Sequence, residues 1–362
     1  MKRTPMYEEH LKLGGRMVDF AGWELPVMYS SIVEEHAAVR NAAGLFDVSH
    51  MGEILVNGAG AAAYLRKLIP TRMEKLARGS SMYSCFCNKA GGVIDDLFVY
   101  MLGDNNFYLV VNASTLDKDF TWMQKHRAPG VEIVNISDDM AKIDLQGPRS
   151  KEIAVRLFGG DRLASLKRFG FMQTEFSGAP CMVSQSGYTG EFGYEFYLPA
   201  KNGLRLWNAL LDAGKDAGIR PCGLGSRDSL RLESCYSLYG HELTEDVTPV
   251  EGGIGWIVSS KDEYIGKPVL AAQKEKGAPR ETVYFEALDR GVPREGCAVT
   301  KSGNEIGKAT SAGYSPTLKK GIGIARVASG SARIGDEVVI VVRDKPLKAR
   351  IVERPFYSYH SV

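Results

Sequence analysis

Gly92-Val-Ile-Asp-Asp-Leu-Phe-Val-Tyr-Met-Leu102 is an apolar run rich in residues that favour β-strands, and Phe107-Tyr-Leu-Val-Val-Asn112 is a second one. Asp104-Asn-Asn106 lies between them and is typical of a turn. Two strand-like runs joined in this way predict a β-hairpin. The first strand carries two adjacent carboxylates, so the hairpin is also a candidate place for chemistry.

Outward from the hairpin, helix-like and strand-like segments are interleaved. Residues 30–44 predict a helix in which Ser31 and Glu34 form a capping box and Gly44 marks the C-terminal stop. Further helices are expected at 61–68, 118–126, 150–158 and 203–217, and short strands at 53–57, 131–136 and 141–145. This mixture favours an α+β fold over a doubly wound sheet.

The character of the chain changes after about residue 277. Short strand-like runs then alternate with glycine- and aspartate-rich turns, at 281–288, 297–301, 305–311, 321–327 and 337–352. They predict a C-terminal all-β barrel or sandwich. We therefore expect two parts, 1–277 and 278–362, with the loop Gln273-Lys-Glu-Lys-Gly-Ala-Pro279 at their boundary.

Charge and composition exclude several classes of protein. Lysine and arginine number 45 against 43 aspartates and glutamates, a net charge of +2, which argues against a nucleic-acid-binding surface. No apolar run is long enough for a transmembrane helix, and the N-terminus lacks the apolar segment of a signal peptide. The six scattered cysteines form no CxxC pair, so we expect reduced thiols in a cytoplasmic protein.

The histidines show no metal-ligand spacing, so a protein-held metal is not expected. They are His10, His36, His50, His126, His241 and His360. His50 is a candidate acid/base, but no nucleophile elbow accompanies it. A structural, hydrogen-bonding histidine is the favoured interpretation.

The first candidate chemical site is the pair Asp95-Asp96 within the hairpin strand. Adjacent strand residues point to opposite faces, so one carboxylate can face a site while its neighbour faces solvent or a turn. A carboxylate in an apolar strand should have a raised pKa, which suits a proton acceptor or a group that orients an amine. The alternative is a pair that caps local backbone.

The second candidate is the glycine-rich loop Ser186-Gly-Tyr-Thr-Gly-Glu-Phe-Gly193 and the following Glu195. The glycines allow a tight turn beside a ligand. Glu195 can accept two parallel hydrogen bonds from an amidine-like or 2-aminopyrimidine edge. The alternative is a structural glutamate paired with an arginine.

The third candidate is Arg227, near the start of a helix expected at 226–233. It can clamp a carboxylate with a bidentate fork, or it can belong to a helix face laced by ion pairs. Aromatic residues accompany these groups and suit a flat ring ligand, although core packing is an equally ordinary role for each. They are Tyr83, Tyr100, Tyr188, Tyr236 and Tyr239.

Taken together, these motifs resemble those of the glycine cleavage T-protein family of tetrahydrofolate-dependent aminomethyltransferases. The resemblance runs from Lys2 to Tyr357. Its motifs are 17–26, 44–52, 91–96, 111–113, 146–148, 187–191, 223–228, 238–242, 315–318 and 354–357. It implies a folate-binding part of βαβ-type and ferredoxin-like units, arranged as two intertwined subdomains, followed by a C-terminal β-barrel.

The resemblance also implies roles for particular residues. Asp96 corresponds to the family's catalytic carboxylate. Glu195 would bind the pterin edge of the folate, and Arg227 would meet its anionic glutamate portion. The folate site would further include Tyr83, Asn112, Tyr188, Tyr236, Tyr100 and Met51, with no metal.

The reaction implied by the resemblance uses the lipoylated H-protein of the glycine cleavage system as partner. The methylene of its aminomethyl group would pass to tetrahydrofolate, with release of ammonia and formation of 5,10-methylenetetrahydrofolate. Two alternatives are a folate-dependent demethylase acting on another one-carbon donor and a non-enzymatic folate-binding assembly factor. Neither a nucleic acid nor a membrane is an expected partner.

The chain departs from the usual T-protein pattern at a few positions. Pro70-Thr71-Arg72 replaces a Thr-Asn-Asp segment, and Gln185-Ser186 replaces an Arg-Thr pair. Asp144 stands where an apolar residue is common, and His241 replaces a glutamine. These departures bear on the one-carbon donor more than on the folate.

Overall fold

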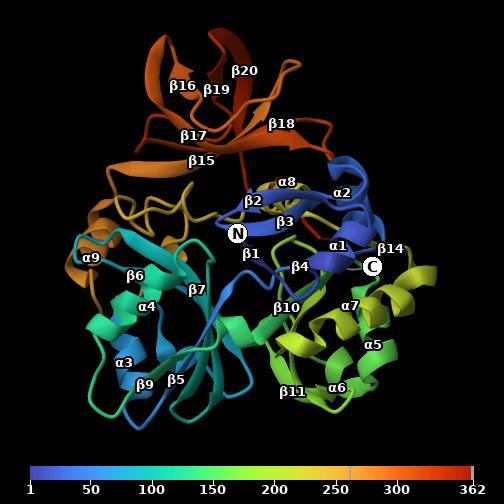
Figure 1. Ribbon diagram of the computed structural model, residues 1–362. Coiled ribbons are helices and arrows are strands. Elements are labelled where there is room, and N and C mark those ends of the chain that lie inside the picture. Colours follow the sequence, from blue (N-terminus) through green and yellow to red (C-terminus); the bar gives the residue numbers. More distant parts are fainter. Residues whose placement is uncertain (261, 360–362) are drawn as a thin grey trace.

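The computed structural model describes residues 1–260 and 262–359. The predicted hairpin is present, because β7 pairs with β8 in antiparallel register. It belongs to a five-stranded sheet, shown at the lower left of Figure 1, in the order β6 (Ser81–Cys87), β7 (Val93–Gly103), β8 (Asn106–Val111), β5 (Gly52–Asn57) and β9 (Glu132–Asn135). Two helices carry residues of the same apolar core, α3 (Ala61–Leu68) and α4 (Leu116–Lys125).

A second sheet of six strands lies beside the first, at the lower right of Figure 1. Its order is β11 (Phe171–Phe176), β12 (Ala179–Ser184), β13 (Gly193–Pro199), β10 (Met140–Gln146), β4 (Ala43–Asp47) and β14 (Ile219–Pro221). The helices on it are α5 (Ser150–Phe158), α6 (Asp161–Ala164) and α7 (Ala200–Gly214). The fully buried Trp207 and Phe196 belong to the core between sheet and helices.

The N-terminal segment forms a small three-stranded sheet that the sequence patterns did not predict. Its order is β1 (Lys2–Arg3), β3 (Trp23–Met28) and β2 (Arg16–Phe20). Three helices accompany it, α1 (Tyr7–Lys12), α2 (Ile32–Asn41) and α8 (Leu224–Glu233). Helix α8 packs against α2 and β3, so it lies where the N-terminal sheet meets the rest of the molecule (Figure 1).

The C-terminal residues form a closed six-stranded barrel, at the top of Figure 1. Its strands in barrel order are β15 (Arg280–Ala287), β18 (Lys320–Ala328), β17 (Asn304–Ser315), β16 (Ala298–Lys301), β19 (Glu337–Val342) and β20 (Lys345–Val352). Leu232 at the end of α8 packs against Ile322 and Ile324 of the barrel. The predicted fold class, α+β with a C-terminal barrel, is confirmed.

Two local predictions are wrong. The helix expected at 30–44 ends at Asn41, and Gly44 lies inside strand β4 rather than at a helix stop. Gly44 has a packing role, because a Cβ there would lie 2.4 Å from Val39 Cγ2 and 2.8 Å from Cys222 Sγ. The first residues of the expected boundary loop, 273–276, form the last turn of α9 (Lys267–Lys276). The division at 277/278 stays a prediction.

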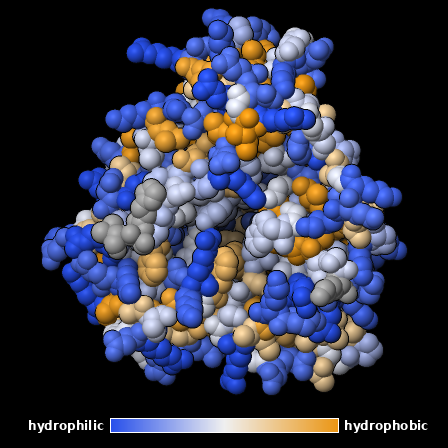
Figure 2. Space-filling model, turned by 180° about the vertical axis from the view of Figure 1, so that it is seen from behind, coloured by the Kyte–Doolittle hydropathy of each residue, from blue (hydrophilic) through white to orange (hydrophobic). Residues whose placement is uncertain are grey.

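The back of the molecule is hollowed near its centre, between the two larger sheets and the barrel (Figure 2). No helix among residues 1–260 and 262–359 is long and apolar enough to cross a membrane. His360 lies outside the described residues.

Candidate functional site

Asp96 on β7 is half-buried, and both of its carboxyl oxygens accept hydrogen bonds. Tyr83 Oη donates to Oδ2 at 2.8 Å, and Asn112 Nδ2 donates to Oδ1 at 2.9 Å. Tyr83 lies on the neighbouring strand β6, and Asn112 directly follows β8. Three adjacent strands therefore hold this one carboxyl group in place.

Asp95 does not face solvent or a turn, as the adjacent-residue pattern allowed. It is fully buried, and Asn112 donates to it twice, from the side chain at 2.8 Å and from the backbone N–H at 3.0 Å. Asp119 on α4 is also fully buried, and it lies close enough to Asp95 for the two carboxyl groups to shift each other's pKa. We call Tyr83, Asp95, Asp96, Asn112 and Asp119 the carboxylate corner.

Burial and mutual repulsion shift the acids of this corner. Burial, reinforced by the charge of Asp95, raises the pKa of Asp96 to about 7, although Tyr83 and Asn112 partly oppose the shift. Burial and the same neighbour raise the pKa of Asp119 to about 11. A pKa this far above neutral favours the protonated form of Asp119. The raised pKa expected for a carboxylate in this strand is found at Asp96.

Glu195 on β13 forms an ion pair, but its cation is Lys142 rather than an arginine. Lys142 Nζ lies 2.8 Å from Oε1, and Ser186 Oγ donates to Oε2 at 2.5 Å. Burial opposes ionisation of Glu195, yet Lys142 and Ser186 hold its pKa below the usual value. Glu195 is thus a buried carboxylate that stays charged.

Arg227 lies in the first turn of α8, as expected, and pairs with the buried Asp144 of β10. Its Nη1 is 2.9 Å from Asp144 Oδ2, and Gln146 Nε2 donates to Asp144 Oδ1 at 2.6 Å. Burial, together with the charge of Glu195, raises the pKa of Asp144 to about 6. We call Lys142, Glu195, Asp144 and Arg227 the ion-pair corner.

Tyr188 lies between the two corners. The Arg227 guanidinium sits 4.9 Å from the centre of its ring, and the charge of Asp96 contributes to its raised pKa. The Tyr236 ring stacks on the Tyr188 ring, with ring centres 5.8 Å apart. We call Tyr188 and Tyr236 the aromatic wall. At the carboxylate corner, the exposed Trp256 stacks on Tyr83 with ring centres 6.0 Å apart.

Two predicted residues, Tyr100 and Met51, lie next to the ion-pair corner rather than in it. Tyr100 is fully buried, and its hydroxyl hydrogen-bonds to that of Tyr197 at 2.9 Å. The Tyr197 hydroxyl in turn donates to Glu195 Oε2 at 3.3 Å. Met51 is half-buried, and its sulfur lies 3.3 Å from Lys142 Nζ. Met51 therefore belongs to the surroundings of the ion-pair corner.

Gly187 and Gly193 in the 186–193 loop leave room for a neighbouring side chain. A Cβ at Gly187 would lie 2.1 Å from Gln146 Oε1, and one at Gly193 would lie 2.1 Å from Gln146 Nε2. Gln146 in turn accepts a hydrogen bond from Thr189 at 2.7 Å. These glycines therefore make room for the amide that holds Asp144.

Burial of the His50 ring bears on both the acid/base and the structural interpretation of this residue. Burial lowers its pKa to about 3, so the ring is neutral. Its Nδ1 has no hydrogen-bond partner in the part of the chain that the structure describes, and the ring packs edge-on against Phe20 at 5.5 Å.

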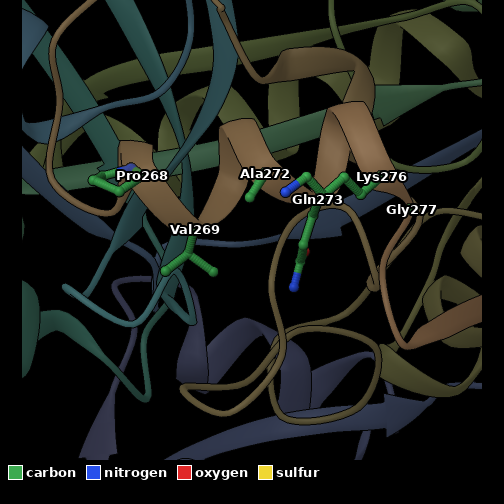
Figure 3. A pocket seen from close by; sticks show the side chains of 6 residues that line it. All are labelled: Pro268, Val269, Ala272, Gln273, Lys276 and Gly277. Atoms are coloured by element: carbon green, nitrogen blue, oxygen red, sulfur yellow. The ribbon is translucent and has the colours of Figure 1, made fainter.

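A groove on the surface lies apart from both corners. A shallow groove of about 450 Å³ runs along α9 and contains none of the predicted site residues (Figure 3). Its lining residues are Pro268, Val269, Ala272, Gln273, Lys276 and Gly277. Within residues 1–260 and 262–359, no group of three or more acidic, histidine or cysteine side chains has the arrangement of a metal site.

Sequence reasoning missed Lys142 and Asp119, and it noted Asp144 only as a departure. Lys142 and Asp144 alternate with the apolar Ala141, Ile143 and Leu145 along β10. Two charges at positions i and i+2 of a strand share one face, which was the available signal. Nothing in the sequence showed that this face meets Glu195.

Family models match almost the whole chain. The glycine cleavage T-protein N-terminal domain matches residues 6–262, and the glycine cleavage T-protein C-terminal barrel domain matches residues 280–358. The match thus covers both the sheets that hold the two corners and the barrel.

Curated relatives and a solved structure agree with the family match. An aminomethyltransferase from Desulforamulus reducens is 48% identical over 99% of this chain and 98% of its own. One from Bacillus subtilis is 45% identical over 99% of each chain. The crystal structure of the glycine cleavage system aminomethyltransferase T from Bartonella henselae superposes with a TM-score of 0.91 at 30% identity, covering 98% of both chains. The chain therefore belongs to the glycine cleavage T-protein family of aminomethyltransferases.

Proposed function

We propose that the protein transfers the methylene of an aminomethyl group, carried by lipoylated H-protein, to tetrahydrofolate. The observation that carries the proposal is Asp96, a half-buried carboxyl group that Tyr83 and Asn112 hold by both oxygens. A fixed anion of this kind stabilises positive charge that develops beside it. The family membership supplies the reaction for which such charge is needed.

In this proposal the ion-pair corner binds the folate. Glu195 is charged and buried, and its two oxygens suit the paired N–H groups of the pterin edge. Arg227 uses Nη1 for its ion pair with Asp144. The other two guanidinium nitrogens of Arg227 are left for an anionic group of the folate. Tyr188 and Tyr236 offer flat faces for the ring system, and Met51 adds apolar contact.

The carboxylate corner then acts on the reacting atoms. Tetrahydrofolate supplies N5 as the nucleophile for the methylene carbon, while ammonia and the dihydrolipoyl thiol leave with the two protons of N5 and N10. Ionised Asp96 orients these nitrogens and stabilises the cationic iminium character. The hydrogen bonds from Tyr83 and Asn112 fix the orientation of the Asp96 carboxylate. Trp256, which is exposed and stacks on Tyr83, adds a further aromatic face.

Compartment and partners follow the same proposal. All six cysteines are unpaired, which is compatible with a reducing compartment, so we place the protein in the cytoplasm. The proposed partners are lipoylated H-protein and tetrahydrofolate, with no resident metal.

The test is product analysis with purified protein. Aminomethyl-loaded H-protein and tetrahydrofolate should give ammonia and 5,10-methylenetetrahydrofolate in equal amounts. Asp96→Asn should lose most of this turnover, whereas Asp104→Asn, in the exposed turn of the same hairpin, should keep it. Formation of methyltetrahydrofolate from a small methylated donor, with no reaction of H-protein, would instead support the demethylase alternative.

A further inference from the structure

Lys142 is a buried cation to which the proposed function gives no direct part. It lies on β10 with 3% of its side chain exposed. Its Nζ is 2.8 Å from Glu195 Oε1 and 3.3 Å from Met51 Sδ, and it sits 5.3 Å from the centre of the Tyr197 ring. The ammonium group therefore forms one side of the site in which Glu195 is the acceptor.

This ammonium group has hydrogen-bonding capacity to spare. It carries three N–H donors, but across residues 1–260 and 262–359 only Glu195 gives it an oxygen within bonding distance. A thioether and an aromatic face are weak acceptors. Glu53 is within electrostatic reach of Lys142, but burial raises the pKa of Glu53 to about 8, so Glu53 is neutral at neutral pH.

The order of groups along this edge is donor, acceptor, acceptor. Lys142 Nζ comes first, Glu195 Oε1 beside it comes second, and Oε2, to which Ser186 donates, comes third. A 2-amino-4-oxo pyrimidine edge presents the complementary order, with the carbonyl oxygen, the ring N–H and the amino group in sequence. A carboxylate alone matches only the last two of these groups.

We propose that Lys142 is a specificity-determining residue that donates to the 4-oxo group of the pterin, so that Lys142 and Glu195 together read its whole polar edge. The proposal rests on the proposed function, because it presumes that a folate binds at Glu195. A ring with an amino group at position 4 loses two matches, because Lys142 then faces a second donor and N3 has no hydrogen to donate to Glu195. The part of this discrimination that Lys142 supplies is the consequence that Glu195 alone does not have.

The test uses tetrahydrofolate and its 4-amino analogue, tetrahydroaminopterin, in which an amino group replaces the 4-oxo group and N3 has no hydrogen. Calorimetry at neutral pH, below the pKa of Glu53, gives the affinity of each for the wild-type protein and for Lys142→Met. We expect the wild type to prefer the 4-oxo ligand and Lys142→Met to reduce this preference about tenfold to hundredfold, the range for a hydrogen bond to a charged group. The preference that remains in Lys142→Met comes from Glu195, which accepts from N3–H of the 4-oxo ring only.

Two features of the experiment keep its outcomes apart. Binding of the 4-amino ligand should be unchanged or tighter in Lys142→Met, which shows that the variant is folded. If Lys142→Met does not fold, Lys142→Gln replaces it, because a glutamine amide can turn to accept from a 4-amino group and should also reduce the preference. A ratio of the two affinities that is the same in the wild type and the soluble variant overturns the proposal, as does the absence of any preference in the wild type. Failure of the wild type to bind tetrahydrofolate at all overturns the proposed function instead.

Discussion

The carboxylate corner and the ion-pair corner are both buried, polar and linked by Tyr188, yet they manage charge in opposite ways. The first gathers Asp95, Asp96 and Asp119; burial raises the pKa of all three, and the charge of Asp95 adds to the rise at Asp96 and Asp119. The second alternates two cations with two anions on neighbouring elements. The first arrangement raises the pKa of Asp96 to about 7, whereas the cation of the second lowers the pKa of Glu195, although burial still raises that of Asp144 to about 6. In the proposed function, this difference separates a reacting role from a binding role.

Breaking an ion pair gives the largest expected effect on stability. Arg227→Leu leaves the buried Asp144 without its cation, which should lower the free energy of unfolding by about 3 kcal/mol. The double variant with Asp144→Leu should recover most of this loss, because no uncompensated charge remains. Urea titration of the wild type and both variants measures the difference.

A surface pair provides the control for this prediction. Arg350→Leu in the barrel breaks an exposed ion pair with Glu337 and should cost less than about 1 kcal/mol. If the Arg227→Leu single variant and the double variant are equally destabilised, charge neutralisation is not what holds the ion-pair corner together.

The pH dependence of the reaction tests the other corner. In the proposed function the ionised form of Asp96 is the active one, and burial raises its pKa to about 7, so kcat/KM should fall as the pH decreases through about 7. Asp95→Asn removes the nearest like charge and should move this acid limb to lower pH by about one unit. A pH profile of kcat/KM for the wild type and Asp95→Asn measures the shift.

Asp104→Asn is the matched control here, since Asp104 is exposed and should leave the acid limb in place. An acid limb that moves to higher pH in Asp95→Asn would show that another group controls the reaction.

A position outside both corners should give the smallest effect. His241 is partly exposed, and its Nδ1–H donates to the Thr310 carbonyl at 3.1 Å. The amide of His241→Gln can replace this donor, so stability should change by less than about 0.5 kcal/mol. Thermal unfolding checks this, and a loss of activity would show that this departure from the family pattern matters.

The sequence predicted the hairpin and several helices well, because their signals are local. The helices at 61–68 and 150–158 agree with α3 and α5 residue for residue. The strand β4 was missed because the helical pattern of 30–44 continued into it, and only its position between β10 and β14 makes it a strand. Local patterns do not contain such sheet order.

The site was predicted in part for the same reason. Asp96 and Glu195 could be selected because a carboxylate within an apolar strand is unusual in itself. Their partners could not, since Asp144 meets Glu195 only through the antiparallel register of β10 and β13. Asp119 reaches Asp95 from a helix that follows the hairpin. Pairings of this kind are properties of the folded chain.

The central claim is that the two corners divide catalysis and binding between them. The most direct test measures, for Asp96→Asn and Glu195→Gln, both kcat with aminomethyl-loaded H-protein and the Kd for tetrahydrofolate. Asp96→Asn should lower kcat by about a hundredfold or more and leave Kd nearly unchanged. Glu195→Gln should raise Kd by about tenfold or more and keep most of kcat at saturating folate. A reversed split, or equal losses of both quantities in both variants, would contradict the account.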